Sequence, residues 1–174
     1  MYFRAVAGLV GGLCAGVVAG IMYLLMTIPD ADGVTIPLLT VIARAVGSND
    51  PATGWSFHLF NSSILGIIFG LVLGSFAVSM LRSALLGLAT GFVFWLISGL
   101  IILPTLLHQP ALSSFSTPDL QPAIVGTLIA SIIYGILLGA IYFMLYSPIL
   151  EDDRRQRYQR AAQEAEPDRT KAAA

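Results

Sequence analysis

The stretch AVAGLVGGLCAGVVAGIMYLLMT, residues 5–27, decides the fold of this chain. It contains no charged residue, and it is long enough to cross the hydrocarbon core of a bilayer, which takes about 20 residues in a helix. Small residues recur in it at every fourth position, so they share one helix face. They are Gly8, Gly12, Gly16 and Gly20. In a membrane, small residues at this spacing let two helix backbones pack closely.

Three later stretches repeat this pattern, near residues 56–78, 84–107 and 122–145, and none of them contains Asp, Glu, Lys or Arg. Their small residues are Ser62, Gly66, Gly70 and Gly74, then Gly87, Gly91 and Gly99, and finally Thr127, Ser131, Gly135 and Gly139. The sequence therefore predicts an all-α, polytopic membrane four-helix bundle of two tandem helical hairpins, packed through glycine-zipper contacts.

The composition agrees with a membrane protein. The 174 residues are 56% hydrophobic and 11% charged, whereas soluble domains are roughly 25% charged. We predict one four-span transmembrane domain over residues 1–147 and a charged cytoplasmic tail over residues 148–174. The first span exceeds the roughly 7–15 apolar residues of a signal peptide, so we expect it to be retained. The net charge of −1 argues against a nucleic-acid partner.

Basic residues are distributed unevenly between the two sides of the predicted bundle. Arg4 precedes the first span, Arg82 lies between the second and third spans, and six basic residues lie in the tail. Only Arg44 lies in a loop on the opposite side. Because Lys and Arg favour cytoplasmic loops, we predict that both termini are cytoplasmic and that the chain lies in the inner (cytoplasmic) membrane of a cell.

The first outer loop contains more than a linker. Residues 36–47 predict a short helix, with Pro37 in its first turn and Gly47 at its C-terminal stop. About a dozen residues are too few to span the bilayer, so we expect this helix to lie at the membrane interface or to fold back over the bundle. Residues 117–119, Thr-Pro-Asp, predict the start of the last helix, and residues 151–174 begin helically and then fray.

The glycine patterns also indicate an internal repeat. Aligned on their small residues, the first span matches the third, and the second span matches the fourth. A duplicated hairpin would relate the two halves by an axis along the membrane normal, as in some transporters. Apolar helices rich in glycine also align readily with one another, so a shared packing pattern without duplication remains the alternative.

The strongest candidates for a polar site are His58 and Asn61, one helical turn apart near the outer end of the second span. A histidine facing a bundle interior can titrate, bind a metal or tetrapyrrole, or hydrogen-bond. His108, at the outer end of the third span, joins this site if the fold brings it near His58. Two histidines alone make a poor metal site. The alternatives are haem or a chlorophyll-type pigment on His58, or purely structural roles, and the sequence identifies no cofactor.

Trp95 is a further candidate because it occupies a position that is small in the other spans. It either lines a cavity between the third and fourth spans, or faces lipid or fills a packing gap. The absence of charged residues from the spans argues against proton relay and ion-coupled transport. No Walker, zinc-protease or nucleophile-elbow motif is present, so we expect no enzymatic activity.

The stretch Gly54-Trp55-Ser56-Phe57-His58, followed by Gly66-Ile67-Ile68-Phe69-Gly70, resembles small uncharacterised bacterial four-helix integral membrane proteins. In those proteins a Gly-Trp pair and a following His lead into a glycine ladder. The resemblance covers residues 1–147 and implies the four-helix fold without an activity. Their fourth helix often carries its own His, whereas this chain has Thr127 and Ser131 there, which weakens a paired-histidine site.

Three function classes remain open. The first is an accessory or structural subunit of a larger respiratory or photosynthetic membrane complex, with the lipid bilayer and other membrane-protein subunits as partners. The small size and the charged tail favour it. The second is a small carrier or channel built from the two-hairpin repeat, which the scarcity of polar residues in the spans opposes. The third is a haem- or pigment-binding protein that uses His58.

Overall fold

The computed structural model describes residues 2–30, 33–113 and 116–172. Four of its helices are long and apolar enough to cross a membrane, and they confirm the predicted four-span bundle. They are α1 (Tyr2–Leu24), α3 (Pro51–Val72), α4 (Met80–Ile97) with its continuation through η1 (Ser98–Ile102) and α5 (Leu103–Leu106), and the first part of α6 (Gln121–Ala172), which follows η3 (Pro118–Leu120). The helices start and end a few residues away from the predicted spans.

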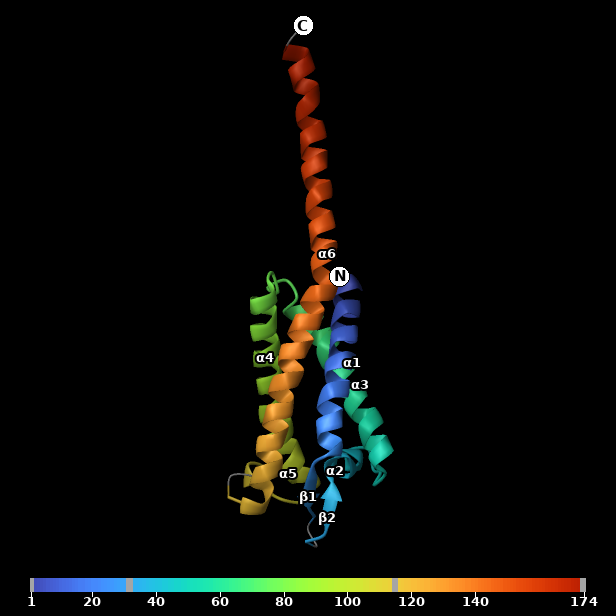
Figure 1. Cartoon of the computed structure of the whole chain (residues 1–174), viewed down its shortest axis with the longest axis vertical. Coiled ribbons are helices and arrows are strands. Elements are labelled where there is room, and N and C mark those ends of the chain that lie inside the picture. The colour runs from blue at the N-terminus through green and yellow to red at the C-terminus, as the bar shows by residue number, and fades with distance from the viewer. Residues whose placement is uncertain (1, 31–32, 114–115, 173–174) are drawn as a thin grey trace.

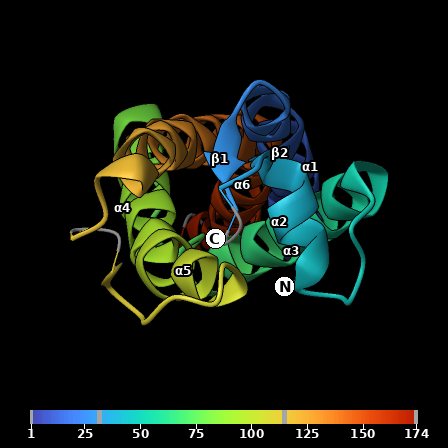
Figure 2. The ribbon, with the colours of Figure 1, turned by 90° about the horizontal axis from the view of Figure 1, so that it is seen from below.

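The four long helices form two hairpins that are joined along one seam. Helix α1 packs on α3, α4 packs on α6, and α1 packs on α6 between the two pairs. In Figure 2 the helices follow one another as α4, α6, α1 and α3, so α3 and α4 lie at the two ends of an arc. Within the described residues, α3 and α4 share hardly any close contact. The bundle is therefore tight along three seams and looser along the fourth.

Glycines occupy the points at which the helix backbones meet. A Cβ built on Gly8 would overlap the carbonyl oxygen of Gly66, and one built on Gly87 would overlap that of Gly135. The same clash with a facing helix backbone occurs at Gly12, Gly66, Gly70, Gly91, Gly135 and Gly139, whereas Gly16, Gly20 and Gly74 face the side chains of Ser62, Trp55 and Tyr142. Any larger residue at the first group would force two helices apart.

The segment between α1 and α3 differs from the all-α expectation. It contains a short antiparallel ribbon of β1 (Thr27–Pro29) and β2 (Thr35–Pro37), two copies of the triplet Thr-Ile-Pro that pair with each other. The β-branched residues suit strands, and Gly33 supplies the left-handed conformation (φ +74°) in the turn between them. Helix α1 therefore ends at Leu24, before the predicted end of the first span.

The predicted short helix is present between the first two spans and is shorter than expected. It is α2 (Leu38–Arg44), and Pro37 precedes it as the N-cap instead of standing in its first turn. Leu38, Leu39 and Val41 are buried, because α2 packs on α3 and touches α5. Of the two placements that the sequence left open, α2 thus folds back over the bundle.

The third span is distorted in its last turns, and Pro104 provides the reason. Proline has no N–H to donate to the carbonyl of Leu100 and clashes with it, so the helix widens into the π-helical turn η1. The freed carbonyl of Leu100 accepts a hydrogen bond from the backbone N–H of Leu112 at 2.8 Å. Leu112 takes a left-handed conformation (φ +67°) to reach it. The loop after α5 is thereby tied to the bundle.

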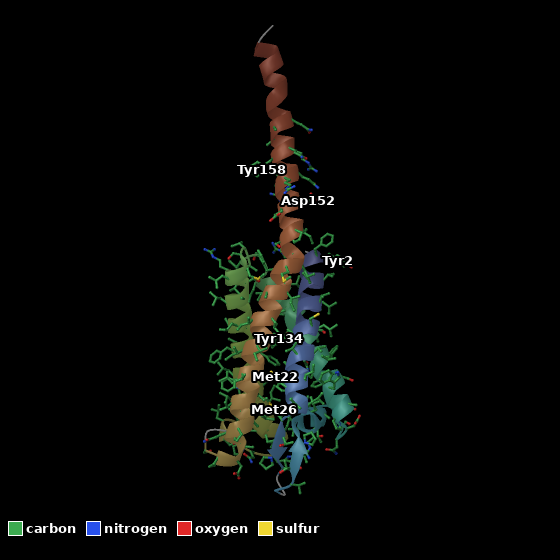
Figure 3. All side chains as sticks on the ribbon, in the orientation of Figure 1. Tyr2, Met22, Met26, Tyr134, Asp152 and Tyr158 are labelled. Carbon is green, nitrogen blue, oxygen red and sulfur yellow. The ribbon has the colours of Figure 1, made fainter. Side chains whose placement is uncertain are left out.

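Helix α6 continues far beyond the bundle (Figure 1). We refer to its residues 151–172 as the arm. The sequence predicted that this region would fray, whereas the structure continues the helix to Ala172. Helix-favouring Ala, Glu, Gln and Arg dominate the arm, and Gln156 donates a hydrogen bond to Asp152 one turn earlier. Figure 3 shows Asp152 and Tyr158 on the arm, away from the other helices.

Candidate functional site

The most site-like feature is a cavity of about 130 Å³ at the end of the bundle where α2 and α5 lie. We call this end the α2 end, and the opposite end, where the N-terminus and the arm lie, the tail end (Figure 1). The cavity is bounded by α1, α2, α3, α4, η1, α5 and α6. The polar side chains in its wall are Tyr23, His58, Asn61, Ser98 and Thr127.

His58 lies on α3, about 10 Å along the helix from Pro51. Its Nε2 lies 2.9 Å from the carbonyl oxygen of Gly16 on α1. A carbonyl only accepts, so Nε2 must be the protonated nitrogen that donates, and Nδ1 of the neutral ring is the acceptor. Gly20 leaves room for this ring edge, because a Cβ there would meet Cδ2 of His58 and the ring of Trp55. The histidine therefore fastens α3 to α1.

Two further polar side chains in the cavity wall have hydrogen-bonding capacity left. Asn61 donates from Nδ2 to the carbonyl of Phe57 at 3.0 Å, one turn earlier on α3. Its Oδ1 makes no hydrogen bond to a residue that the structure describes. Ser98 begins η1, and its hydroxyl likewise has no partner within the described residues. Ser98 therefore adds a polar group to the wall opposite α3.

The other polar side chains near the cavity satisfy one another. Trp95 donates from its indole N–H to the carbonyl of Ile124 at 3.3 Å and to the hydroxyl of Thr127 at 3.2 Å. The hydroxyl of Tyr23 forms a hydrogen bond with Ser131. These bonds join α4 and α1 to α6. Trp95 is 7% exposed, fills the space that Gly99 leaves and does not belong to the cavity wall.

Tyr134 lies near the middle of the bundle (Figure 3). Its hydroxyl donates to the carbonyl of Ser62 at 2.8 Å, and this bond joins α6 to α3 across the bundle. The small residue Ser62 is buried beneath Gly16 of α1. Aromatic side chains thus bond at these small residues, Trp95 to the hydroxyl of Thr127 and Tyr134 to the backbone carbonyl of Ser62.

His108 lies in a second pocket and not beside His58. This pocket opens at the α2 end and is also lined by Asp30, Arg44 and Asn49. Arg44 and Asp30 form a two-pronged ion pair at 2.6 and 2.9 Å, and Nε of Arg44 donates to Asn49 at 3.2 Å. The two pockets share Leu106 in their walls. The structure thus places the predicted histidines in separate pockets.

The tail end holds an aromatic cluster around Arg4. Nε of Arg4 donates to the hydroxyl of Tyr146 at 3.0 Å, and its guanidinium lies 5.6 Å from the centre of that ring. Tyr142 is fully buried with its ring edge-on to Phe69, and its hydroxyl finds no partner among the described residues. These contacts fix the start of α1 to α6 and α3.

Sequence reasoning selected His58 and Asn61 but missed Ser98 as their counterpart. The signal for Ser98 was its place as a polar residue within an apolar span. Among the described residues, no three side chains of His, Cys, Asp or Glu cluster as metal ligands would. With Nε2 of His58 bonded to the carbonyl of Gly16, Nδ1 is the ring nitrogen that makes no hydrogen bond within the described residues.

The fold and the spans define an integral membrane protein with four transmembrane helices. Compared with known protein families, with curated proteins and with solved structures, the chain gives no match. No family is therefore assigned.

Proposed function

We propose that this chain is a non-catalytic accessory subunit of a larger membrane complex, of the respiratory or photosynthetic type. The observation that carries the proposal is the arm. It extends α6 by about 33 Å beyond the bundle, and each of its described side chains is exposed. An isolated polar helix gains little stability in water from its own hydrogen bonds, so a partner protein is the natural source of stabilisation.

The charge pattern of the arm supports a docking role. Acidic and basic residues alternate along it, with Tyr158 as an exposed aromatic side chain (78%) among them. Charge complementarity of this kind selects a partner and its register. The clustering of basic residues at the tail end favours the cytoplasmic side of the inner membrane for both termini. The partner we propose is therefore a membrane subunit with a cytoplasmic surface of alternating charge.

The other two functions receive less support. A cavity of about 130 Å³ is too small for a tetrapyrrole, since a cavity of about 150 Å³ holds only a benzene-sized molecule. Nε2 of His58 is also engaged by Gly16. A carrier needs a polar path across the bundle, and the close backbone contacts between Gly8 and Gly66 close that path toward the tail end.

Purification from native membranes in a mild detergent tests the proposal. The full chain should co-purify with the same large subunit at fixed stoichiometry. The double variant Arg155→Glu and Arg160→Glu should lose that subunit while the bundle keeps its melting temperature, because both residues are exposed on the arm. The matched control is Gln159→Glu and Gln163→Glu, which adds acidic side chains at exposed positions without reversing a charge.

A chain that purifies alone from native membranes, with or without the arm substitutions, would contradict the proposal. Retention of the same subunit by the Arg155→Glu and Arg160→Glu variant would show that the arm is not the docking element.

A further inference from the structure

The cavity at the α2 end carries three polar atoms with unused hydrogen-bonding capacity. They are Nδ1 of His58, Oδ1 of Asn61 and Oγ of Ser98, and none of them bonds to a residue that the structure describes. Two lie on α3 and the third on η1, so they reach the same space from two sides. Leaving such groups unpaired inside a membrane costs roughly 1–3 kcal/mol each. Their convergence indicates a polar ligand group.

The orientation of His58 sets the chemistry of that group. Nε2 and Cδ2 form the ring edge that faces Gly16 and Gly20 of α1. Nδ1 belongs to the opposite edge and carries a lone pair, because Nε2 holds the proton. Oδ1 of Asn61 is also an acceptor. The cavity therefore presents two acceptors on α3, which favour a ligand with a hydroxyl donor over one with carbonyl oxygens alone.

The size and walls of the cavity favour a single six-membered ring. Its volume of about 130 Å³ is close to that of an engineered cavity, about 150 Å³, that takes up benzene. Phe57 of α3 and Phe94 of α4 supply aromatic walls from the two helices at the ends of the arc. Aromatic side chains favour stacked or edge-on contacts with a further ring.

The position of the cavity indicates that the ligand arrives from the lipid. It lies between α3 and α4, two membrane-spanning helices that hardly touch each other. Phe57, Asn61 and Ser98 are partly exposed, and Ile102 is exposed, along this opening. Toward the α2 end, α2 and α5 pack on each other and cover the cavity. A hydrocarbon tail attached to the ring would leave through the opening into the bilayer.

We propose that this cavity binds the ring of a quinol-type membrane lipid, a six-membered ring that carries a hydroxyl and a hydrocarbon tail. One hydroxyl of the quinol donates to Nδ1 of His58, and its second hydroxyl donates to Oδ1 of Asn61 and accepts from the hydroxyl of Ser98. The ring lies among Phe57 and Phe94. The proposal concerns binding alone and assigns no electron transfer to the chain. It stands independently of the docking role of the arm.

Binding of small probes to the full chain in detergent tests the proposal. The probes are a short-tailed benzoquinol, kept reduced under nitrogen, and its dimethyl ether, which has the same ring but cannot donate a hydrogen bond. The quinol should bind about tenfold more tightly than the ether, because the ether leaves Nδ1 and Oδ1 unpaired. Competition against the quinol measures both affinities.

Three variants of the chain show where the probe binds. Ala45 is exposed on the cavity wall, so Ala45→Phe should fill the cavity and weaken quinol binding at least about tenfold. Val46→Phe, at the exposed neighbouring residue outside the wall, is the control and should bind normally. His58→Gln keeps an amide donor for Gly16 and removes Nδ1, so it should reduce the preference of the chain for quinol over ether, because only Oδ1 of Asn61 is left as the acceptor.

Several results would overturn the proposal. One is equal binding of quinol and ether to the unaltered chain. Another is quinol binding that Ala45→Phe leaves unchanged, which would place the probe elsewhere, for example in the detergent or at the lipid-facing surface. A high-resolution structure with water or a phospholipid chain in the cavity at saturating quinol would also contradict it. The proposal would be supported if Ala45→Phe lost quinol binding while Val46→Phe kept it, and if Ala45→Phe melted at the same temperature as the unaltered chain.

Discussion

The two ends of the bundle are built in different ways. At the tail end, α1 meets α3 through Gly8 and Gly66, and α4 meets α6 through Gly87 and Gly139, backbone against backbone. At the α2 end, aromatic and polar side chains separate the same helices, and a cavity lies between them. Close glycine contacts thus pack the tail end tightly, whereas the α2 end keeps a cavity.

The largest effect should come from breaking a glycine contact. Gly12→Leu places a side chain against the carbonyl of Ser62, which should destabilise the bundle by about 3 kcal/mol or more because the helices must move apart. The measurement is the melting temperature in detergent. Val10→Leu adds bulk at an exposed position of the same helix and is the control. Equal stability of both variants would show that these contacts do not hold α1 to α3.

A smaller effect should follow from removing the indole N–H of Trp95. Trp95→Phe loses the bonds to Ile124 and Thr127 that join α4 to α6, and it also leaves some space unfilled. We expect a loss of about 2 kcal/mol in the free energy of unfolding. Val93→Leu, at an exposed position of the same helix, is the control and should change stability little. An unchanged free energy of unfolding for Trp95→Phe would show that the hydrogen bonds of the Trp95 indole do not stabilise the bundle.

The hydrogen bond that joins the two hairpins at mid-bundle should contribute less to the free energy of unfolding. Tyr134→Phe removes only the hydroxyl that donates to Ser62, and we expect a loss of about 1 kcal/mol, since hydrogen bonds between membrane helices are modest. Reversible unfolding in mixed micelles measures it. A loss as large as that of Gly12→Leu would place the main cohesion of the bundle in polar bonds instead of glycine contacts.

The smallest effect should come from the hydroxyl of Ser83. This hydroxyl donates to the carbonyl of Gly139 at 2.7 Å within a backbone contact that already holds α4 on α6. Ser83→Ala should therefore cost about 0.6 kcal/mol. Thr90→Val is the control, because the hydroxyl of Thr90 bonds within its own helix to Leu86. If Ser83→Ala and Thr90→Val lower the free energy of unfolding equally, the interhelical hydrogen bond of Ser83 stabilises the bundle no more than a bond within one helix.

Much of the fold could be predicted from the sequence, because long apolar stretches without charges have few alternatives to spanning helices. The Thr-Ile-Pro ribbon could not, since Ile28 looks like the continuation of a span until its pairing with Ile36 is known. His58 and Asn61 were predicted as polar residues within a span. Their relation to Ser98 was not, because it depends on how α3 and α4 are placed around the cavity and on α2 folding back over the bundle.

The most direct test of a ligand site at the α2 end is a ¹⁵N spectrum of the histidines. The chain has two, so His108→Gln assigns the signals of His58 in the labelled protein. We expect a neutral ring with the proton on Nε2 and an open lone pair on Nδ1, and a shift of the Nδ1 signal when benzoquinol is added. A proton on Nδ1, or a Nδ1 signal that quinol leaves unchanged, would contradict it.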